Sequence, residues 1–354
     1  MLCSALTVAV LACSGDDDGA DGADGASAGS GDGPNTSSPT GADVDPVPSS
    51  GCGASTASTV AAGEEKVTMR SGDVERWYLR HVPPAHDGTT PVPVVVDLHG
   101  YTEGADVHAV HSVLGPFGDD RGFVTITPQG TGTVAMWQAA PGSPDVAFAG
   151  DLLDQVEETL CVDTARVFVT GLSNGAMMTS VLACEMADRF AAAAPVAGVT
   201  EIDGCDPARP VPLVAFHGTE DPFLDFEGGF GPGVANLPTP DGSGTIGEAA
   251  GDEPAVPAGP TVPEVVAGWA GRNGCSDDEP TEDALADDVT VVAYDCPAGA
   301  EVELYRVEGG GHTWPGAEML KAATDVVGIT TFSVSANEVM WEFFLDHPLP
   351  AEPG

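Results

Sequence analysis

The fold of this chain is decided at residues 167–188, which read VFVTGLSNGAMMTSVLACEMAD. The stretch begins as an apolar, β-branched run typical of a buried strand and continues from Asn174 as a run typical of a helix. Between the two lies Gly-Leu-Ser-Asn-Gly, which has the pattern G-x-S-x-G and whose small residues permit a sharp strand-to-helix turn. Such a turn lifts the hydroxyl of Ser173 above the sheet edge, next to a helix N-terminus that favours negative charge. The segment therefore predicts a nucleophilic serine at the carboxyl end of a strand.

Similar apolar runs recur along the chain and alternate with helical stretches such as 145–160. They lie at 92–99, 123–127, 191–198, 211–218 and 302–307. Nearly continuous apolar runs are typical of strands that are buried on both faces. The alternation therefore predicts an α/β fold with a mostly parallel sheet and helices on both faces. Ahead of it, 66–70 and 75–82 alternate polar with apolar residues, which predicts antiparallel edge strands.

A serine hydroxyl is a weak nucleophile until a base accepts its proton, so a histidine and an acid are expected nearby. Asp221 follows the strand predicted at 211–218, within His-Gly-Thr-Glu-Asp-Pro. His312 follows the strand predicted at 302–307, within Gly-Gly-Gly-His-Thr-Trp-Pro. Because the carboxyl ends of parallel strands meet at one edge of a sheet, Ser173, Asp221 and His312 are predicted to converge there.

Two other acids and one other histidine lie close to these motifs. Glu220 and Asp225 are alternative acids, although Asp221 is the one followed by proline at the expected turn. His217 is interpreted as a structural histidine that closes its strand.

The remaining histidines are not predicted to act in catalysis. His108 and His111 lie three positions apart on a predicted helix, a spacing that could hold a metal ion. No third ligand accompanies them, so a polar helix face is the favoured interpretation and no metal site is predicted. His81, His86 and His347 are expected at the surface.

An acyl-transfer site also needs backbone N–H groups that bind the negatively charged oxygen of the tetrahedral intermediate, an oxyanion hole. Asn174, directly after the serine, and Tyr101, after the strand that ends Asp-Leu-His-Gly, are predicted to supply them. Trp137 and Trp314 are candidates for an aromatic wall of the substrate site. Core packing is the equal alternative for both tryptophans.

The overall charge limits the possible partners. The chain of 354 residues carries 55 acidic and 11 basic side chains, a net charge of −44. A surface this negative repels phosphates, so no nucleic-acid partner is expected. Anionic membrane surfaces are disfavoured for the same reason.

The N-terminal region has the composition of an export segment followed by a tether. A short apolar run ends at Val-Leu-Ala-Cys13, which resembles a bacterial lipobox and predicts a signal peptide over 1–13 whose cysteine is lipidated. Membrane contact is expected only through such an anchor. Residues 14–50, rich in Gly, Asp, Ser and Pro, are predicted to be a disordered tether. The catalytic domain is predicted over 51–350, with a Gly- and Pro-rich insertion at 226–263 that follows the acid and could rim the cleft.

Five motifs occur in a fixed order along the folded part. They are LHG at 98–100, GLSNGAMM at 171–178, APVAG at 194–198, HGTEDP at 217–222 and GGGHTWPG at 309–316. Together they resemble the polyhydroxybutyrate depolymerase-like esterases, a group that includes secreted feruloyl and acetylxylan esterases. The resemblance spans roughly residues 60–346.

This resemblance implies an α/β-hydrolase fold, no cofactor, and hydrolysis of esters of extracellular polymers or oligomers through an acyl-enzyme. Carried over to this chain, Ser173 is the nucleophile, Asp221 the acid and His312 the base. Three alternatives remain open: a peptidase or lyase on the same fold, a catalytically inactive surface-binding protein, and a binder of phosphorylated ligands, which the net charge disfavours.

Six of the eight cysteines lie beyond the export segment, and an even number in an exported chain favours disulfides. Cysteine count alone leaves fifteen pairings open. Cys275 ends a predicted helix and Cys296 ends a predicted strand, so a bond between them would support the loop that carries His312.

The resemblance also implies a disulfide between Cys184 and Cys205. Cys52 and Cys161 are then the remaining pair. No Cys-x-x-Cys pair or His-Cys cluster points to a metal site.

Overall fold

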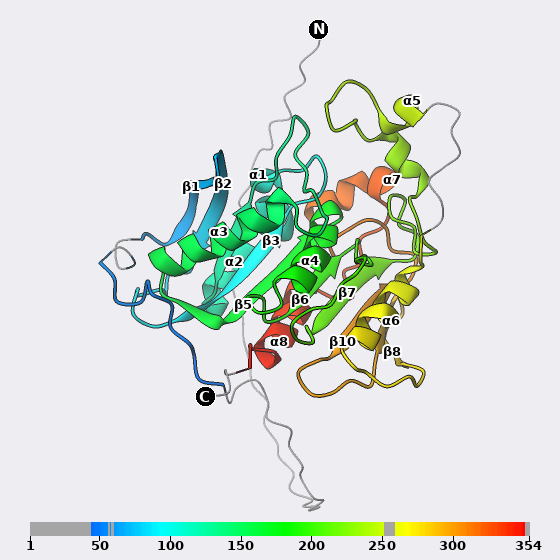
Figure 1. Cartoon of the computed structure of the whole chain (residues 1–354). Helices are drawn as coiled ribbons and strands as arrows, with labels where there is room; N and C mark the ends of the chain where they lie inside the picture. The colour runs from blue at the N-terminus through cyan, green and yellow to red at the C-terminus, as the bar shows by residue number, and fades with distance from the viewer. Residues whose placement is uncertain (1–43, 56, 58–59, 251–258, 351–354) are drawn as a thin grey trace, which may run out of the picture. The chain divides into compact units, whose positions relative to one another are not determined.

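The computed structural model describes residues 44–55, 57, 60–250 and 259–350. A ten-stranded sheet runs through this part in the order β1-β2-β4-β3-β5-β6-β7-β10-β9-β8 (Figure 1). The strands are β1 (Gly63–Ser71), β2 (Val74–Val82), β3 (Val92–Leu98), β4 (Val124–Pro128), β5 (Val162–Leu172), β6 (Ala193–Val196), β7 (Leu213–Gly218), β8 (Thr281–Ala286), β9 (Val289–Ala293) and β10 (Val302–Val307). Six neighbouring strands in the middle of the sheet pair in parallel: β4, β3, β5, β6, β7 and β10. Antiparallel hairpins flank them, β1 and β2 on one side and β9 and β8 on the other.

Helices connect the strands and cover the sheet. They are α1 (Ala105–Ser112), α2 (Leu114–Arg121), α3 (Pro144–Thr159), α4 (Asn174–Glu185), α5 (Ile246–Ala250), α6 (Val262–Arg272), α7 (Thr324–Val327) and α8 (Ala336–Asp346), with 3₁₀ turns η3 (Pro232–Asn236) and η4 (Met319–Ala323). None of the helices in the described part is both long and apolar enough to cross a membrane.

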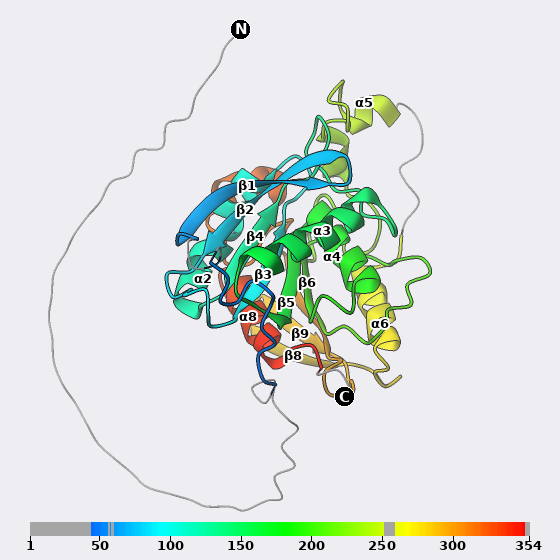
Figure 2. The same ribbon diagram turned by 60° about the vertical axis from the view of Figure 1, so that its left-hand side comes forward.

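The core consists of two layers, one on each face of the sheet. Successive side chains of a strand point to opposite faces. In β3, Val94 and Val96 therefore join the cluster that contains side chains of α3, α4 and α6, whereas Val95 joins the cluster that contains side chains of α2 and α8. Figure 2 shows α3, α4 and α6 on one side of the sheet and α2 and α8 on the other. The prediction of a mostly parallel sheet with helices on both faces is confirmed.

The sheet differs from the prediction at its edges. β1 is an edge strand as predicted, but β2 is interior because it pairs with β4 on its other side. The opposite edge is the hairpin of β8 and β9. The strand predicted to end at Cys296 corresponds to β9, which ends at Ala293, whereas the sequence pattern did not indicate β8. β8 reads Thr-Glu-Asp-Ala-Leu-Ala and is almost entirely exposed, so it lacks the apolar face that marks a strand in a sequence.

Residues 44–50 pack against the start of β5, although they were predicted to belong to the tether. The amide of Val47 donates a hydrogen bond to Asp163 Oδ1 (2.8 Å), and Ser49 Oγ donates one to the carbonyl of Leu160 (2.8 Å). The folded domain therefore begins before residue 51. Cys13, the predicted signal peptide and the tether up to residue 43 lie outside the described residues.

Three disulfides cross-link the domain, and they are the three expected pairs. Cys52–Cys161 joins the N-terminal segment to the residue before β5, Cys184–Cys205 joins the end of α4 to a later loop, and Cys275–Cys296 joins the segment after α6 to the loop after β9.

Candidate active site

Ser173 occupies the turn between β5 and α4 in a backbone conformation that L-residues rarely adopt, with φ 58° and ψ −118°. The flanking glycines are required by close packing. A Cβ at Gly171 would lie 2.7 Å from Leu98 Cβ, and one at Gly175 would overlap the carbonyl oxygen of Leu98. Strained residues of this kind persist only where the surroundings hold them, and they cluster at functional sites.

Asp221 and His312 meet at the carboxyl edge of the sheet, after β7 and β10. His312 Nδ1 donates a hydrogen bond to Asp221 Oδ2 over 2.7 Å. The other carboxylate oxygen, Oδ1, accepts hydrogen bonds from the amides of Phe223 (2.8 Å) and Leu224 (2.9 Å). The carboxylate is therefore fixed on one side by the backbone and presents its second oxygen to the imidazole.

The electrostatics of this pair favour an ionised acid. Burial by itself would raise the pKa of Asp221, but the charge and the hydrogen bond of His312 outweigh it and lower the pKa. Glu220 and Asp225, the alternative acids, are exposed and make no hydrogen bond or ion pair with His312 in the described part of the chain. Asp221 is thus the acid that the geometry pairs with the histidine.

His217 lies behind the acid, buried beneath the loop that carries it. Its Nε2 donates to the carbonyl of Leu224 (2.9 Å) and lies 3.5 Å from Asp221 Oδ2. Burial lowers its pKa, which favours the neutral ring. The interpretation of His217 as a structural histidine agrees with these contacts.

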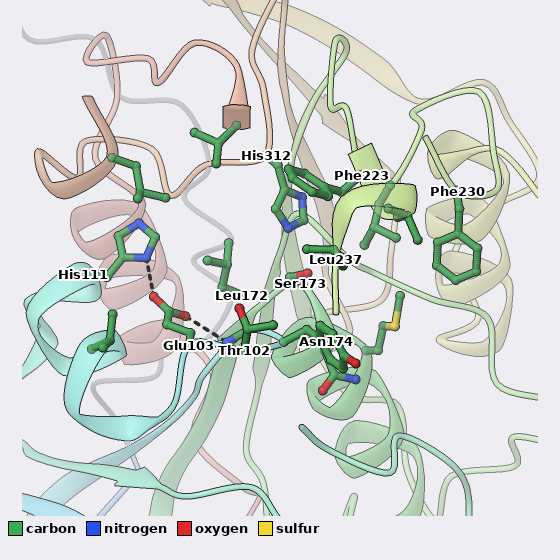
Figure 3. Close-up of a pocket in the computed structure, with 18 of the residues that line it drawn as sticks. Thr102, Glu103, His111, Leu172, Ser173, Asn174, Phe223, Phe230, Leu237 and His312 are labelled. Carbon is green, nitrogen blue, oxygen red and sulfur yellow. Dashed lines mark hydrogen bonds and ion pairs between the residues drawn. The ribbon is translucent and has the colours of Figure 1, made fainter. Parts of the chain in front are cut away.

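Ser173 and His312 line a pocket of about 620 Å³. Figure 3 shows the ring of His312 pointing toward Ser173, with His111 and Phe230 toward opposite ends of the pocket. Most of the other lining side chains are apolar: Val107, Leu172, Met177, Phe223, Leu224, Val234, Leu237, Ile246, Met319, Leu320 and Val327. The insertion after Asp221 supplies part of this wall, and Tyr101 Oη ties it to the body of the domain by a hydrogen bond to the carbonyl of Pro238 (2.9 Å).

Tyr101 and Asn174, the residues predicted to form the oxyanion hole, also line this pocket. Neither backbone amide donates a hydrogen bond to any atom of the described residues. Asn174 is the first residue of α4, so its amide belongs to the unpaired N–H groups of a helix N-terminus. Neither amide therefore has a partner within the described residues.

The prediction that Trp137 and Trp314 form a substrate wall is wrong. Both side chains are buried, with 2% and 1% exposure, and neither lines the pocket. The indole of Trp137 donates to the carbonyl of His99 (2.9 Å), and its backbone amide donates to Asn174 Oδ1 (2.7 Å). Core packing, the alternative interpretation, accounts for both tryptophans, because each ring fills the interior and satisfies its N–H there.

The prediction that His108 and His111 belong to a polar helix face does not account for their position, because the two side chains lie in the interior. Both are buried, with 0% and 1% exposure, and both contact Glu103, which sequence reasoning missed. The three could be taken for a metal site because their ligand atoms lie within 4.8 Å of one another. Both ring nitrogens of His108, however, are engaged by the carboxylates of Glu103 and Asp97. His108 therefore has no ring nitrogen left for an ion as long as these contacts hold, and the contacts present form a charge network of His108 and His111 with the two carboxylates.

His347 is likewise buried, at 7% exposure, because its ring bonds to Glu301 and to the carbonyl of Phe343. His81 and His86 are partly exposed. The expectation of a surface position is therefore wrong for His347.

Comparison with known proteins identifies the family. Residues 119–223 match the prolyl oligopeptidase family. A probable feruloyl esterase C of Aspergillus niger is 33% identical over 187 residues, which cover 51% of this chain and 65% of that protein. The putative esterase NocK of Nocardia uniformis subsp. tsuyamanensis is 30% identical over 305 residues, which cover 81% of this chain and 83% of NocK. The chain belongs to the same esterase family as NocK, and its fold is that of the α/β-hydrolases.

A solved structure of an acetyl xylan esterase from Aspergillus awamori shares the fold. Its TM-score is 0.52 at 17% identity, over 75% of this chain and 98% of the other. The chain spans only part of several curated relatives, from 20% of a bifunctional acetylxylan esterase/xylanase of Neocallimastix patriciarum to 65% of the probable feruloyl esterase C of Aspergillus niger.

Proposed function

We propose that this chain is a serine hydrolase of carboxylic esters, with Ser173 as nucleophile, His312 as base and Asp221 as acid. The observation that carries the proposal is the buried 2.7 Å hydrogen bond from His312 to Asp221, on the wall of the pocket that Ser173 also lines. The membership of the family supports it, since relatives bear the names of feruloyl and acetylxylan esterases.

In the proposed reaction, Ser173 Oγ attacks the ester carbonyl while His312 Nε2 takes its proton. The amides of Tyr101 and Asn174 bind the oxyanion that forms. The alcohol leaves with the proton from His312, and an acyl-enzyme remains. A water molecule, deprotonated by the same imidazole, then releases the carboxylic acid and restores the serine. Asp221 holds the imidazole with its proton on Nδ1 throughout.

The pocket supports neutral esters with an apolar acyl or aryl group as substrates. Its walls are largely apolar, and its volume of about 620 Å³ exceeds what an acetyl group fills. We propose ester groups of the feruloyl or hydroxybutyrate type, carried by extracellular polymers or oligomers, with acetyl esters as the smaller alternative.

Two assays test this function. Ser173→Ala should abolish hydrolysis of p-nitrophenyl acetate, whereas Ser276→Ala, at an exposed serine away from the pocket, should not alter it. Turnover by a folded Ser173→Ala protein would refute the nucleophile. A panel of methyl ferulate, an acetylated xylo-oligosaccharide, a hydroxybutyrate trimer and a p-nitroanilide amide then separates the substrate classes. Cleavage of the amide alone would favour a peptidase, and inertness toward every compound would favour a binding protein.

We further propose that the enzyme acts outside the cytoplasm. The support is the set of three disulfides, which persist in oxidising compartments. Lipidation of Cys13 remains a proposal on the sequence motif. Cys13→Ser should move the enzyme from the membrane fraction to the medium without changing its activity on a soluble ester. A wild-type enzyme found wholly in the medium would exclude the anchor.

A further inference from the structure

Glu103 sits in the loop after β3 and contacts the backbone of that loop directly. Its Oε2 accepts hydrogen bonds from the amide of Gly100 (2.9 Å) and from His108 Nδ1 (2.9 Å). Its Oε1 accepts one from His111 Nδ1 (2.8 Å), which Figure 3 shows at the pocket wall. One carboxylate thus ties two histidines of α1 to the residue that precedes Tyr101.

The cluster is rigid because its charges are buried and paired. His108 Nε2 donates to Asp97 Oδ1 (2.7 Å) on its far side, so the ring lies between two carboxylates. Burial would lower the pKa of His108, but the charges of Asp97 and Glu103 outweigh it and raise the pKa. Burial likewise opposes ionisation of Glu103, and His108 and His111 still hold its pKa below the usual range. The cationic ring of His108 therefore lies between the carboxylates of Asp97 and Glu103 and stabilises both.

The loop that the cluster holds is conformationally strained. Thr102 has a φ of 70°, which is uncommon for a residue with a side chain. Its amide donates to the carbonyl of Ala135 (2.9 Å), so the loop is held at Thr102 from one side and at Gly100 by Glu103 from the other. The amide of Tyr101 lies between these two fixed points and makes no hydrogen bond within the described chain.

We propose that Glu103 is a positioning residue that aims the Tyr101 amide at the oxyanion. This inference rests on the proposed esterase function. Glu103 acts through the Gly100 amide and does not take part in proton transfer. An oxyanion-hole donor contributes only when charge develops on the carbonyl oxygen, so a misplaced donor lowers kcat and leaves KM largely unchanged.

The size of the expected effect follows from the role of one donor. Removal of a single oxyanion donor costs about 10²–10³-fold in kcat. Glu103→Ala removes the bond to Gly100, so we expect a loss of about 10²-fold in kcat for p-nitrophenyl acetate with KM within about twofold. Glu103→Gln retains a carbonyl oxygen that can accept from Gly100, so kcat should stay within about tenfold of the wild type.

A transition-state analogue separates positioning from a structural effect. A trifluoromethyl ketone adds to the serine and places an alkoxide in the oxyanion hole. Its inhibition constant should rise in Glu103→Ala by about the factor lost in kcat/KM, while inhibition by the product alcohol stays unchanged. The matched control is Glu185→Ala, which removes another carboxylate bond to a glycine amide, Gly142 (3.0 Å), away from the pocket. Its kcat should equal that of the wild type.

Three outcomes would overturn the inference. The first is a folded Glu103→Ala enzyme with wild-type kcat, and the second is a loss that appears in KM rather than in kcat. The third applies if the alanine variant does not fold. Glu103→Asp then replaces it, because aspartate keeps the charge but draws the carboxylate back from the Gly100 amide. A wild-type kcat in Glu103→Asp would refute the positioning role of Glu103. If Ser173→Ala is inert while the Glu103 variants keep full activity, the esterase proposal stands and only this inference fails.

Discussion

Replacement of Asp221 by asparagine should disable the base without disturbing the fold. Oδ1 of Asp221 is held by the amides of Phe223 and Leu224, and those two donors will select the carbonyl oxygen of the asparagine. The NH₂ group must then face His312 Nδ1. The imidazole responds by moving its proton to Nε2, the atom that has to accept the proton of the nucleophile. The variant is therefore trapped in the wrong tautomer.

The loss expected from this tautomer is about 10⁴-fold in kcat, or about 5.4 kcal/mol of transition-state stabilisation. The assay is hydrolysis of p-nitrophenyl acetate at pH 7, with active enzyme counted by titration. Asp225→Asn is the matched control, because this exposed carboxylate accepts a similar backbone bond from Glu227 (3.0 Å) and should keep full activity. A folded Asp221→Asn enzyme that retains a tenth of the wild-type rate would refute the reasoning.

Three further predictions concern stability. Trp314→Phe should lower the free energy of unfolding by about 1–3 kcal/mol, because the buried Oδ1 of Asn337 loses its donor. KM should stay unchanged, and a higher KM would restore the substrate-wall interpretation. Alanine at both Cys275 and Cys296, 21 positions apart, should cost about 3 kcal/mol in urea unfolding, and an unchanged midpoint would contradict this. His108, whose pKa is raised to about 10 between two carboxylates, should stabilise the fold fully below about pH 6.5 and lose that contribution as the pH rises toward 10. NMR of the ring nitrogens that shows a neutral His108 at pH 8 would exclude this contribution to stability.

The sequence predicts the chemistry of the site better than its surroundings. Ser173, Asp221 and His312 each follow a strand whose apolar run is continuous, and parallel strands carry their following loops to one edge. Strand order and motif order together were enough to predict that these loops converge. The pairing of Asp221 rather than Glu220 with the histidine also followed from the turn that proline enforces.

Packing partners were less accessible from the sequence. In the sequence, a tryptophan near a catalytic loop looks the same whether it faces a ligand or the core. The burial of the Trp137 ring and its bond to the carbonyl of His99 distinguish the two. The histidines of α1 looked like a polar face because their partners, Asp97 and Glu103, come from a strand and a loop outside the helix. The one available sequence signal for this cluster was the spacing of two acids, Asp97 near the end of β3 and Glu103 in the loop that follows.

Both ends of the described chain lie at the same pole of the domain. Val47 and Leu349 donate backbone hydrogen bonds to Asp163 and Ala165 near the start of β5, while Ser173 follows its last residue. With about 3.3 Å per residue, the 11 residues of this strand separate the two poles by about 36 Å. A fusion partner or a bead joined directly to either end of the described residues is therefore attached opposite the sheet edge that carries Ser173. Immobilisation at these two points keeps the support away from the edge that carries Ser173, which leaves room there for bulky, insoluble material.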